Sequence, residues 1–197
     1  RQKYGNNRYR YSNIRKWLNS SAGSWYTAQH SADAPPNTTA SVGNAGTQYQ
    51  SRPGFLYHFS TQERALLGVS SVVVNLASVD GGTTETLEDT VFLPTYKELG
   101  GSGGADVGET FEMYVDASNE NRIGYMHQNA FDNTLSSSKP SAANQPWYYW
   151  LREPLASSSN NVRSVYTGGS LSYNYAYIGT YGVRPCLFIP MQSGVQV

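Results

Sequence analysis

The sequence predicts an α+β domain that combines short helices, short strands and long loops. Helix-capping patterns occur at residues 12–19 and 60–63, next to apolar side chains at helical spacing. Short runs rich in β-branched and aromatic residues follow and indicate strands. Polar stretches rich in Gly, Ser, Asn and Pro separate these segments. The length of 197 residues favours one domain over residues 1–197.

Three capping patterns predict the helices. Ser12 can cap a helix over residues 12–19, in which the apolar side chains share one face. The Ser-x-x-Glu spacing at residues 60–63 is a capping box and predicts a second helix. The Thr-x-x-Glu spacing at residues 95–98 repeats this pattern, so we expect a short helix that ends at the glycines of 100–104.

The remaining elements follow from composition. The runs with strand composition are 71–76, 89–94, 147–152 and 183–189. Residues 80–82 form the turn after the first run, residues 109–116 fit a helix, and 31–54 and 136–145 fit loops. The last strand places Cys186 among apolar residues, so we expect a buried strand with an inert thiol.

Charge and hydropathy argue against two classes of function. The chain has 14 Lys and Arg and 14 Asp and Glu, a net charge of +0, whereas nucleic-acid binding requires a basic face. No apolar run approaches the roughly 20 residues of a membrane helix, so no membrane insertion is expected. The chain begins without Met, and we expect it to be the C-terminal part of a longer protein.

Candidate metal sites are weak. The carboxylates within 85–89 offer oxygen ligands for calcium, although a solvated loop is the preferred interpretation. Residues 116–121 resemble the start of a calcium loop, but Gly is missing at its sixth position and His127 stands at its twelfth. His30 and Asp33 are three residues apart, and a hydrogen-bonded structural histidine is preferred there to a metal ligand.

Signatures of catalysis are missing from the sequence. It contains no G-x-S-x-G elbow, no H-E-x-x-H zinc motif, no phosphate-binding loop and no dinucleotide-binding glycine pattern. Cys186 is the single cysteine, which excludes an intrachain disulfide and a cysteine-based zinc site. No catalytic residue is therefore nominated, and we expect a protein that is not an enzyme.

Residues 155–183 carry the most informative composition. They are rich in Ser, Asn and Tyr, and they contain no Lys, Glu, Gln, Met or Trp. These five amino acids are the ones that no codon ending in a pyrimidine encodes, so randomising the adenines of Asn codons yields every residue except these. Tyr, Ser and Asn are also typical of binding surfaces that contain little charge. An ordinary polar loop with some buried Tyr is the alternative.

Five motifs in order resemble a bacterial and phage domain family of unknown function. They are S-N-I-R-x-W-L-N at 12–19, G-F-L at 54–56, D-T-V-F-L-P at 89–94 followed by Glu98-Leu99, W-L-R-E-P at 150–154 and G-V-R-P at 182–185. The resemblance covers residues 6–189. Glu153 replaces a usual small residue, and residues 100–145 match poorly, so the role of that stretch stays open.

This resemblance implies a C-type-lectin-like fold, with short helices around small antiparallel sheets and extensive loops, related to formylglycine-generating enzymes. Members often serve as variable proteins of diversity-generating retroelements, whose variable positions lie between the W-L-R and G-V-R-P motifs. Residues 155–183 would then be a variable ligand-binding segment. The candidate ligand-binding residues are Ser157, Ser158, Ser159, Asn160, Asn161, Arg163, Ser164, Tyr166, Ser172, Tyr173, Asn174, Tyr175, Tyr177 and Tyr181. The implied scaffold positions within the segment are Val162, Val165, Gly169, Leu171 and Ile178.

The function implied is a receptor-binding domain displayed on a phage virion or a bacterial cell surface. Its expected partners are a host-surface protein or glycan, other virion or surface proteins, and further copies of the chain in a homo-oligomer. No cofactor is expected, and a structural calcium would rest on fold analogy alone. The alternatives are a capsid or tail decoration protein without a ligand and an enzyme of formylglycine-generating type, against which the lone Cys186 argues.

Overall fold

A computed structural model gives the fold, and residues 7–28, 52–103, 107–126, 144–178 and 181–190 are described. The α-helices in these residues are α1 (Asn13–Leu18) and α2 (Thr61–Leu66), and the 3₁₀ helices are η1 (Tyr9–Tyr11), η4 (Phe55–His58), η5 (Ser78–Asp80), η6 (Glu112–Tyr114) and η7 (Glu120–Arg122). The strands are β1 (Ser70–Asn75), β2 (Thr84–Asp89), β3 (Val91–Phe92), β4 (Gly124–Tyr125), β5 (Pro146–Trp147), β6 (Tyr149–Pro154), β7 (Asn161–Val165), β8 (Leu171–Tyr175) and β9 (Cys186–Leu187).

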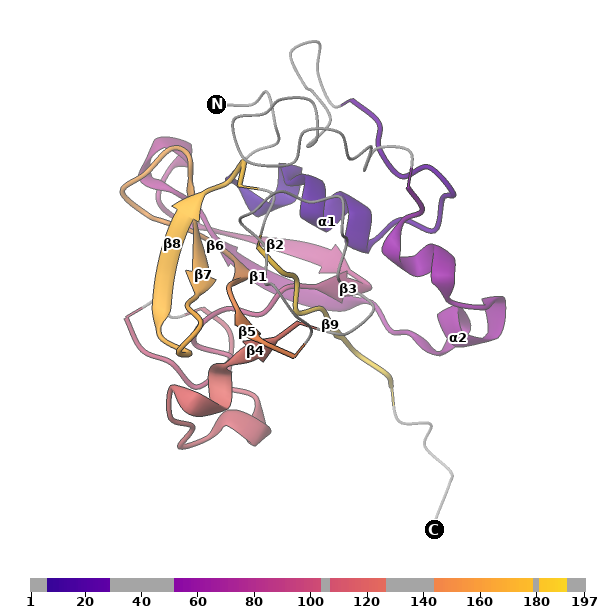
Figure 1. The fold of residues 1–197 in the computed structure, drawn as a ribbon. Coiled ribbons are helices and arrows are strands. Elements are labelled where there is room, and N and C mark those ends of the chain that lie inside the picture. Colours follow the sequence, from indigo (N-terminus) through magenta and orange to yellow (C-terminus); the bar gives the residue numbers. More distant parts are fainter. Residues whose placement is uncertain (1–6, 29–51, 104–106, 127–143, 179–180, 191–197) are drawn as a thin grey trace.

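The strands of the described residues form small antiparallel sheets (Figure 1). β1 pairs with β2, β3 with β9 and β4 with β5, and the largest sheet has three strands in the order β6-β7-β8. β3 and β9 come from segments far apart in the sequence, so their pairing closes the fold. The predicted α+β class, with few short helices and small antiparallel sheets, is confirmed.

The first predicted helix is confirmed. The Ser12 hydroxyl accepts the amide of Arg15 at 3.1 Å and caps α1. Leu18 is fully buried, and Trp17 packs edge-on against Phe55 with ring centroids 5.4 Å apart. The apolar face of α1 therefore lies on the core, as its spacing indicates.

The second capping box is also confirmed, but its helix is peripheral. The Ser60 hydroxyl accepts the Glu63 amide at 3.1 Å, and the Glu63 carboxylate accepts the Ser60 amide at 2.7 Å. No residue of α2 is buried, and Leu66 is 54% exposed. Local capping fixes this helix without core packing.

The helix expected after Thr95 is wrong. The reciprocal capping bonds do form, since the Glu98 carboxylate accepts the Thr95 amide at 2.9 Å and the Thr95 hydroxyl accepts the Glu98 amide at 3.1 Å. The segment is nevertheless a turn, because Gly100 adopts a left-handed φ of 71° directly after its first turn. The helix expected over 109–116 is likewise reduced to η6.

Several strand predictions need correction. The strand at 71–76 is confirmed as β1, but the run at 89–94 forms only β3, and β2 precedes it unpredicted. The aromatic run at 147–152 is split between β5 and β6 at Tyr148. The buried strand at 183–189 is wrong: β9 has two residues, and Phe188 and Ile189 are 53% and 56% exposed.

The core has two clusters on either side of β6. One gathers α1, β1, β2 and β3 around Val74, Leu93 and Trp150. The other contains Tyr149 and Val165 together with residues of the 96–114 region. Alternate residues of β6 thus contribute to different clusters, as expected for a strand buried on both faces.

Some sequence-based interpretations lie outside the described residues. These are the possible metal pair His30 and Asp33, His127 at the end of the calcium-like pattern, and most of the loops expected at 31–54 and 136–145. Among the residues that the structure describes, no helix has the length and apolar character required to cross a bilayer.

Candidate functional site

The candidate segment forms a β-hairpin at one margin of the molecule (Figure 1). β7 and β8 pair antiparallel, with Arg163 opposite Tyr173 and Asn161 opposite Tyr175. β7 also pairs with β6, so β8 is the edge strand of the sheet. The middle of the segment, 161–175, is therefore a strand ladder with its turn and not an irregular polar loop.

One face of this hairpin carries exposed tyrosines. Opposed residues of an antiparallel pair share a face, so Arg163, Tyr173 and Tyr175 lie together. Tyr173 is 53% and Tyr175 44% exposed, and Tyr177, itself 37% exposed, stacks on Tyr175 with centroids 5.2 Å apart and planes 4° apart. We name Arg163, Tyr173, Tyr175 and Tyr177 the tyrosine face.

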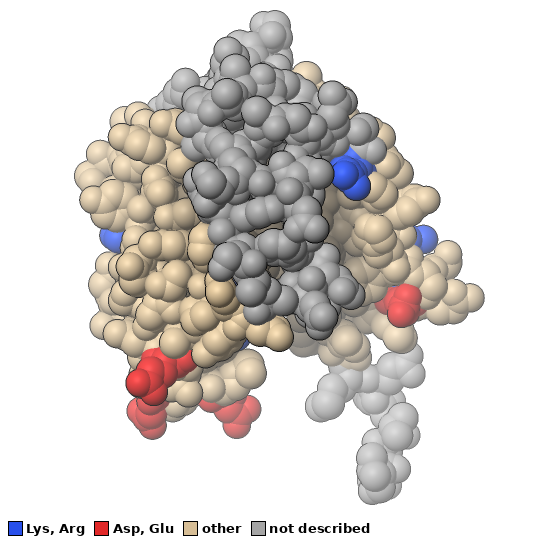
Figure 2. Space-filling view, in the orientation of Figure 1, with Lys and Arg blue, Asp and Glu red and all other residues tan. Residues whose placement is uncertain are grey.

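The tyrosine face contains little charge. Residues 155–190 contain no Asp or Glu, and their charged residues are Arg163 and Arg184. In Figure 2 most of the visible described surface is uncharged, and acidic side chains gather at a lower corner, over the 107–126 segment. None of the described carboxylates forms an ion pair with Arg163, so its charge is available at the surface.

The opposite face packs into an aromatic cluster. Tyr181 stacks on both Tyr148 and Trp150, with centroids 4.8 and 4.5 Å apart, and its hydroxyl accepts the Asn174 side-chain amide at 2.9 Å. Tyr166 meets Tyr148 edge-on at 5.0 Å. Burial, together with the neighbouring Tyr166 and Tyr181, raises the pKa of Tyr148 to about 12. This face is thus partly internal, and Tyr181 serves packing as well as display.

The polar loop before β7 is organised by one serine. The Ser158 hydroxyl donates to the Asn160 side-chain oxygen at 2.8 Å and accepts the amides of Asn160 and Asn161 at 3.2 and 3.1 Å. Its carbonyl accepts the Asn7 side chain at 3.1 Å. Ser158 therefore shapes the loop, while Ser157 is exposed beside it and Ser159 is half-buried.

One candidate residue, Ser164, differs sharply in burial from the tyrosine face. Ser164 is fully buried, and its hydroxyl has no hydrogen-bond partner among the described residues. Ser172, directly opposite, is half-buried. We therefore leave Ser164 out of the exposed surface. The positions implied as scaffold are internal or turn-forming: Val165 is fully buried, Val162, Leu171 and Ile178 pack on the core clusters, and Gly169 lies in the hairpin turn.

A buried arginine holds the hairpin turn. Arg122 is 6% exposed, lies over the Tyr96 ring and donates to the Asn119 side chain at 2.6 Å. It also donates to the carbonyls of Leu99, Gly100, Ala117 and Gly169 at 3.0–3.4 Å. Gly169 has a φ of 82°, and a Cβ there would lie 1.7 Å from the Asn119 carbonyl oxygen. Only glycine fits this approach, so the turn is fixed to the 117–122 segment.

A buried ion pair supports β6. The Arg152 guanidinium binds both oxygens of Glu98, at 2.6 and 2.5 Å, with side chains 1% and 7% exposed. It also donates to the carbonyls of Val73 and Leu93 at 3.0 and 2.7 Å. The adjoining Glu153 is fully buried and accepts the amide of Tyr96 at 3.1 Å. These contacts tie β6 to β1 and to the turn after Thr95.

A third arginine, Arg184, links two tyrosines of the core. The Arg184 guanidinium donates to the Tyr114 hydroxyl and, at 3.4 Å, to the Tyr149 hydroxyl. It also lies over both rings, 5.5 and 5.6 Å from their centroids. The Tyr149 hydroxyl in turn donates to the Arg122 carbonyl at 2.7 Å. Burial raises the pKa of Tyr149 to about 12, against the opposing effect of Arg184.

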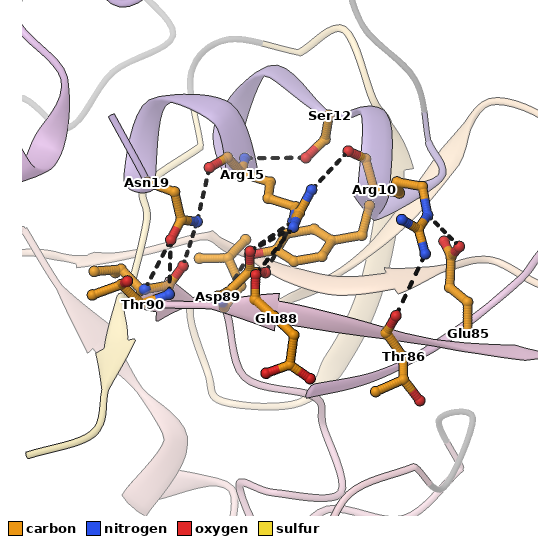
Figure 3. Close-up of polar contacts among 12 residues, drawn as sticks. Arg10, Ser12, Arg15, Asn19, Glu85, Thr86, Glu88, Asp89 and Thr90 are labelled. Atoms are coloured by element: carbon orange, nitrogen blue, oxygen red, sulfur yellow. Dashed lines mark hydrogen bonds and ion pairs between the residues drawn. The ribbon is translucent and has the colours of Figure 1, made fainter. Parts of the chain in front are cut away.

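The acidic cluster at 85–89 is neither a loop nor a group of free carboxylates. Figure 3 shows the N-terminal arginines reaching β2, where Arg15 binds Asp89 and Arg10 binds Glu85. Arg8 binds Glu85 as well, at 2.9 and 2.7 Å. Burial raises the pKa of Asp89, and Arg15 opposes this shift. The arginines thus occupy Glu85 and Asp89, two of the three carboxylates that the calcium hypothesis requires, while the Glu88 side chain is exposed.

Glu85 provides a test by pH. Burial raises its pKa, but hydrogen bonds and charge from Arg8 and Arg10 outweigh burial, so the net pKa is lowered. A carboxyl with a lowered pKa stabilises the fold above its unfolded pKa of about 4.3, and that stabilisation is lost as pH falls. We expect the difference in thermal midpoint between wild type and Glu85→Gln to shrink from about pH 6 to about pH 3.5.

Circular dichroism at both pH values measures this difference, and the exposed neighbour Glu88 supplies the control variant Glu88→Gln. A difference for Glu85→Gln that stays constant with pH would contradict the assigned ion pairs.

The comparisons give one match. A family model described as a domain of unknown function (DUF6273) matches residues 1–191. The chain belongs to this family. No curated protein and no solved structure matches the chain.

Sequence reasoning missed two residues that shape the site of this DUF6273 domain. Arg122 lies in a stretch without a recognisable motif. Its carbonyl acceptors are spread from Leu99 to Gly169, so no local pattern in the sequence predicts its role. Tyr148 lies in the predicted strand 147–152 and is not among the candidate residues, yet it is half-buried beside two of them, Tyr166 and Tyr181. Its alternation with the buried Tyr149 is the signal that could have found it.

The described part of the DUF6273 domain contains no group of three His, Cys, Asp or Glu side chains arranged to hold a metal ion. Cys186 is half-buried against the core, and burial raises the pKa of its thiol to about 11. At neutral pH it is therefore a protonated thiol and not a thiolate nucleophile.

Proposed function

We propose that this DUF6273 domain binds a macromolecular ligand through the tyrosine face. The observation that carries the proposal is the contrast between the exposed Tyr173, Tyr175 and Tyr177 and the buried Arg122 that holds the turn of their hairpin. Exposed tyrosines are common singly, but a stacked pair beside a third ring on one sheet face is a contiguous apolar surface.

The chemistry of this face suits recognition. Tyr offers a large rigid contact area and one hydroxyl while losing little conformational entropy on binding. Ser and Asn side chains at the end of the hairpin, such as Ser157 and Asn160, add adaptable hydrogen bonds. Because the face has few charges, binding should depend only weakly on salt.

We regard binding without catalysis as the better proposal. The protonated, half-buried Cys186 offers no activated nucleophile, which disfavours an enzyme of formylglycine-generating type. A decoration protein without a ligand remains the competing proposal, and it predicts that the tyrosine face can be altered without consequence for binding.

The proposal has three further parts. We propose that the fold is C-type-lectin-like, that the domain is displayed on a phage virion or a bacterial surface, and that a retroelement diversifies the hairpin. The absence of Lys, Glu, Gln, Met and Trp from 155–183 supports diversification. Sequencing the encoding locus from several isolates tests it. We expect a near-copy of the segment that encodes 147–185, differing at adenines, beside a reverse transcriptase gene. Invariant codons and no such repeat would refute diversification and leave a fixed binding domain.

A triple variant tests the binding surface. Replacing Tyr173, Tyr175 and Tyr177 with Ala should abolish binding of the fluorescently labelled domain to intact bacteria in a panel of strains, measured by flow cytometry. The three side chains are exposed, so we expect the thermal midpoint to stay nearly unchanged.

The matched control replaces Tyr57 and Tyr125, which are 51% and 63% exposed on other elements, with Ala. Equal binding by wild type and the triple variant would refute the proposed face, and a large fall in midpoint would show that the three tyrosines stabilise the fold.

A further inference from the structure

The hydrogen bonds between β7 and β8 show which main-chain groups of β8 point away from the sheet. The Tyr166 amide donates to the Ser170 carbonyl, and the Ala176 amide donates to the Asn160 carbonyl, both at 2.8 Å. Hydrogen-bonded pairs alternate along an antiparallel ladder. The even-numbered residues of β8 therefore direct their amide and carbonyl groups to β7, and the odd-numbered residues direct theirs away from the sheet.

Of the three odd-numbered residues of β8, Tyr175 already has hydrogen-bond partners for its amide and its carbonyl. The Tyr175 amide donates to the Asn174 side chain at 2.8 Å, and its carbonyl accepts the Ile178 amide at 3.0 Å. No described residue bonds to the outward amide or carbonyl of Leu171 or Tyr173. The middle of β8 therefore offers two donors and two acceptors in the spacing of a strand edge.

The outward edge of another strand, β2, is covered by arginine side chains. On β2 the outward carbonyls of Thr86 and Glu88 accept the guanidinium groups of Arg10 and Arg15, each at 3.4 Å. Such covering by charged side chains prevents an edge from pairing with another chain. β8 contains no charged residue and no proline, so it lacks this protection.

β8 is the last strand of its sheet. In Figure 1 it lies on the left side of the molecule, with β7 on its inner side. Tyr173 projects from the middle of this edge with 53% of its surface exposed, and Arg163 lies opposite it on the neighbouring strand.

From these observations we infer that the partner of the tyrosine face is a polypeptide that adds an extended strand to the β8 edge. Main-chain bonds to Leu171 and Tyr173 would supply affinity, and the tyrosine side chains would read alternate residues of the added strand. This inference rests on the proposed function and narrows its ligand to a protein segment.

The charge of the hairpin indicates which kind of added strand is complementary to it. The hairpin has the positive Arg163 beside Tyr173 and no carboxylate anywhere in 155–190. A strand with an acidic side chain on the face that carries Arg163 is complementary, whereas a second copy of β8 has no carboxylate to offer this arginine. The inferred occupant is therefore an acidic extended segment of a different protein.

A pair of variants separates main-chain from side-chain recognition. A random-peptide display library is selected against the wild-type domain, and the affinity of an enriched synthetic peptide is measured for Tyr173→Ala and Tyr173→Pro. Both variants lack the ring, but only proline lacks the outward amide, which takes no part in the ladder with β7. We expect enrichment of acidic peptides, and binding to the proline variant about tenfold weaker, or more, than to the alanine variant.

Amide hydrogen exchange of the wild-type domain gives a second readout that needs no variant. The amides of Leu171 and Tyr173 should exchange fast in the free protein and slowly with the peptide bound. Unchanged exchange, or equal affinity of the two variants, would overturn strand addition and leave side-chain recognition intact. If no peptide is enriched but the domain still binds bacteria, strand addition is overturned and the proposed function stands. If the domain binds neither peptides nor bacteria, the proposed function itself is refuted. Self-association abolished by Tyr173→Pro would assign the edge to a second copy.

Discussion

Replacing Arg152 with Met is expected to lower the free energy of unfolding by about 3–5 kcal/mol, because it leaves the buried Glu98 carboxylate without its partner. Two main-chain carbonyls, those of Val73 and Leu93, lose a donor in the same change. A typical domain has a total stability of about 5–15 kcal/mol, so this single substitution would remove a large share of it.

Urea denaturation followed by tryptophan fluorescence measures the loss. In the double variant Arg152→Met, Glu98→Gln neither charge remains, so we expect a smaller loss than in the single variant. Arg10→Met is the surface control, since Arg10 is 39% exposed and its pair should contribute only about 0–1 kcal/mol. A loss for Arg152→Met as small as that of Arg10→Met would contradict the importance of this pair.

Replacing Arg122 with Met is expected to cost about 3 kcal/mol or more, because the buried carbonyls that it satisfies each cost about 1–3 kcal/mol when left without a donor. These acceptors lie in the turn after Tyr96, in the segment before η7 and in the hairpin turn at Gly169. The variant should therefore weaken ligand binding as well, since it releases the hairpin from its support.

Denaturation and flow cytometry measure the two effects of Arg122→Met. Arg163→Met is the matched control: it removes an arginine of the tyrosine face that forms no ion pair with a described carboxylate, and stability should change by no more than about 0.5 kcal/mol. Arg122→Lys keeps the charge but not the planar fork and should fall between the two. Similar stability losses for Arg122→Met and Arg163→Met would refute the structural role of Arg122.

Local signals in the sequence were reliable where the interaction is local. Ser12 and Ser60 cap helices through bonds to residues three positions away, and both helices form. The Thr95 pattern makes the same bonds but no helix, because Gly100 and the contacts of Glu98 with distant Arg152 decide the path of the chain. A capping pattern therefore predicts its own hydrogen bonds better than the length of the helix.

The missed elements depend on residues far apart in the sequence. β2 contains three acidic residues and looks like a solvated loop, but Arg8, Arg10 and Arg15 approach it from more than 70 positions away. Residues 186–189 are apolar and were expected to be buried, but they pair with β3 and Gly68 through their main chain while Phe188 stays exposed. The composition of a segment indicates how hydrophobic it is, but it does not indicate which side of the segment will be covered by another part of the chain.

For the candidate site, the sequence indicated the segment but not its shape. Tyr173, Tyr175 and Tyr177 are exposed as a ligand-binding role requires. The burial of Ser164 depends on its pairing with Trp150 on β6, which no property of the segment itself specifies. Distinguishing displayed from internal residues therefore required the register of the sheet.

The acceptors of the internal arginines have an evolutionary consequence. Arg122 binds mainly to main-chain oxygens, and Arg152 binds two of them besides the Glu98 carboxylate. Main-chain oxygens are present whatever side chain a position carries. Substitution of the outward residues of the hairpin leaves these bonds unchanged, so such mutations draw little on the margin of stability that selection must preserve. We therefore expect the outward positions of the hairpin to tolerate substitution better than the internal positions that hold it.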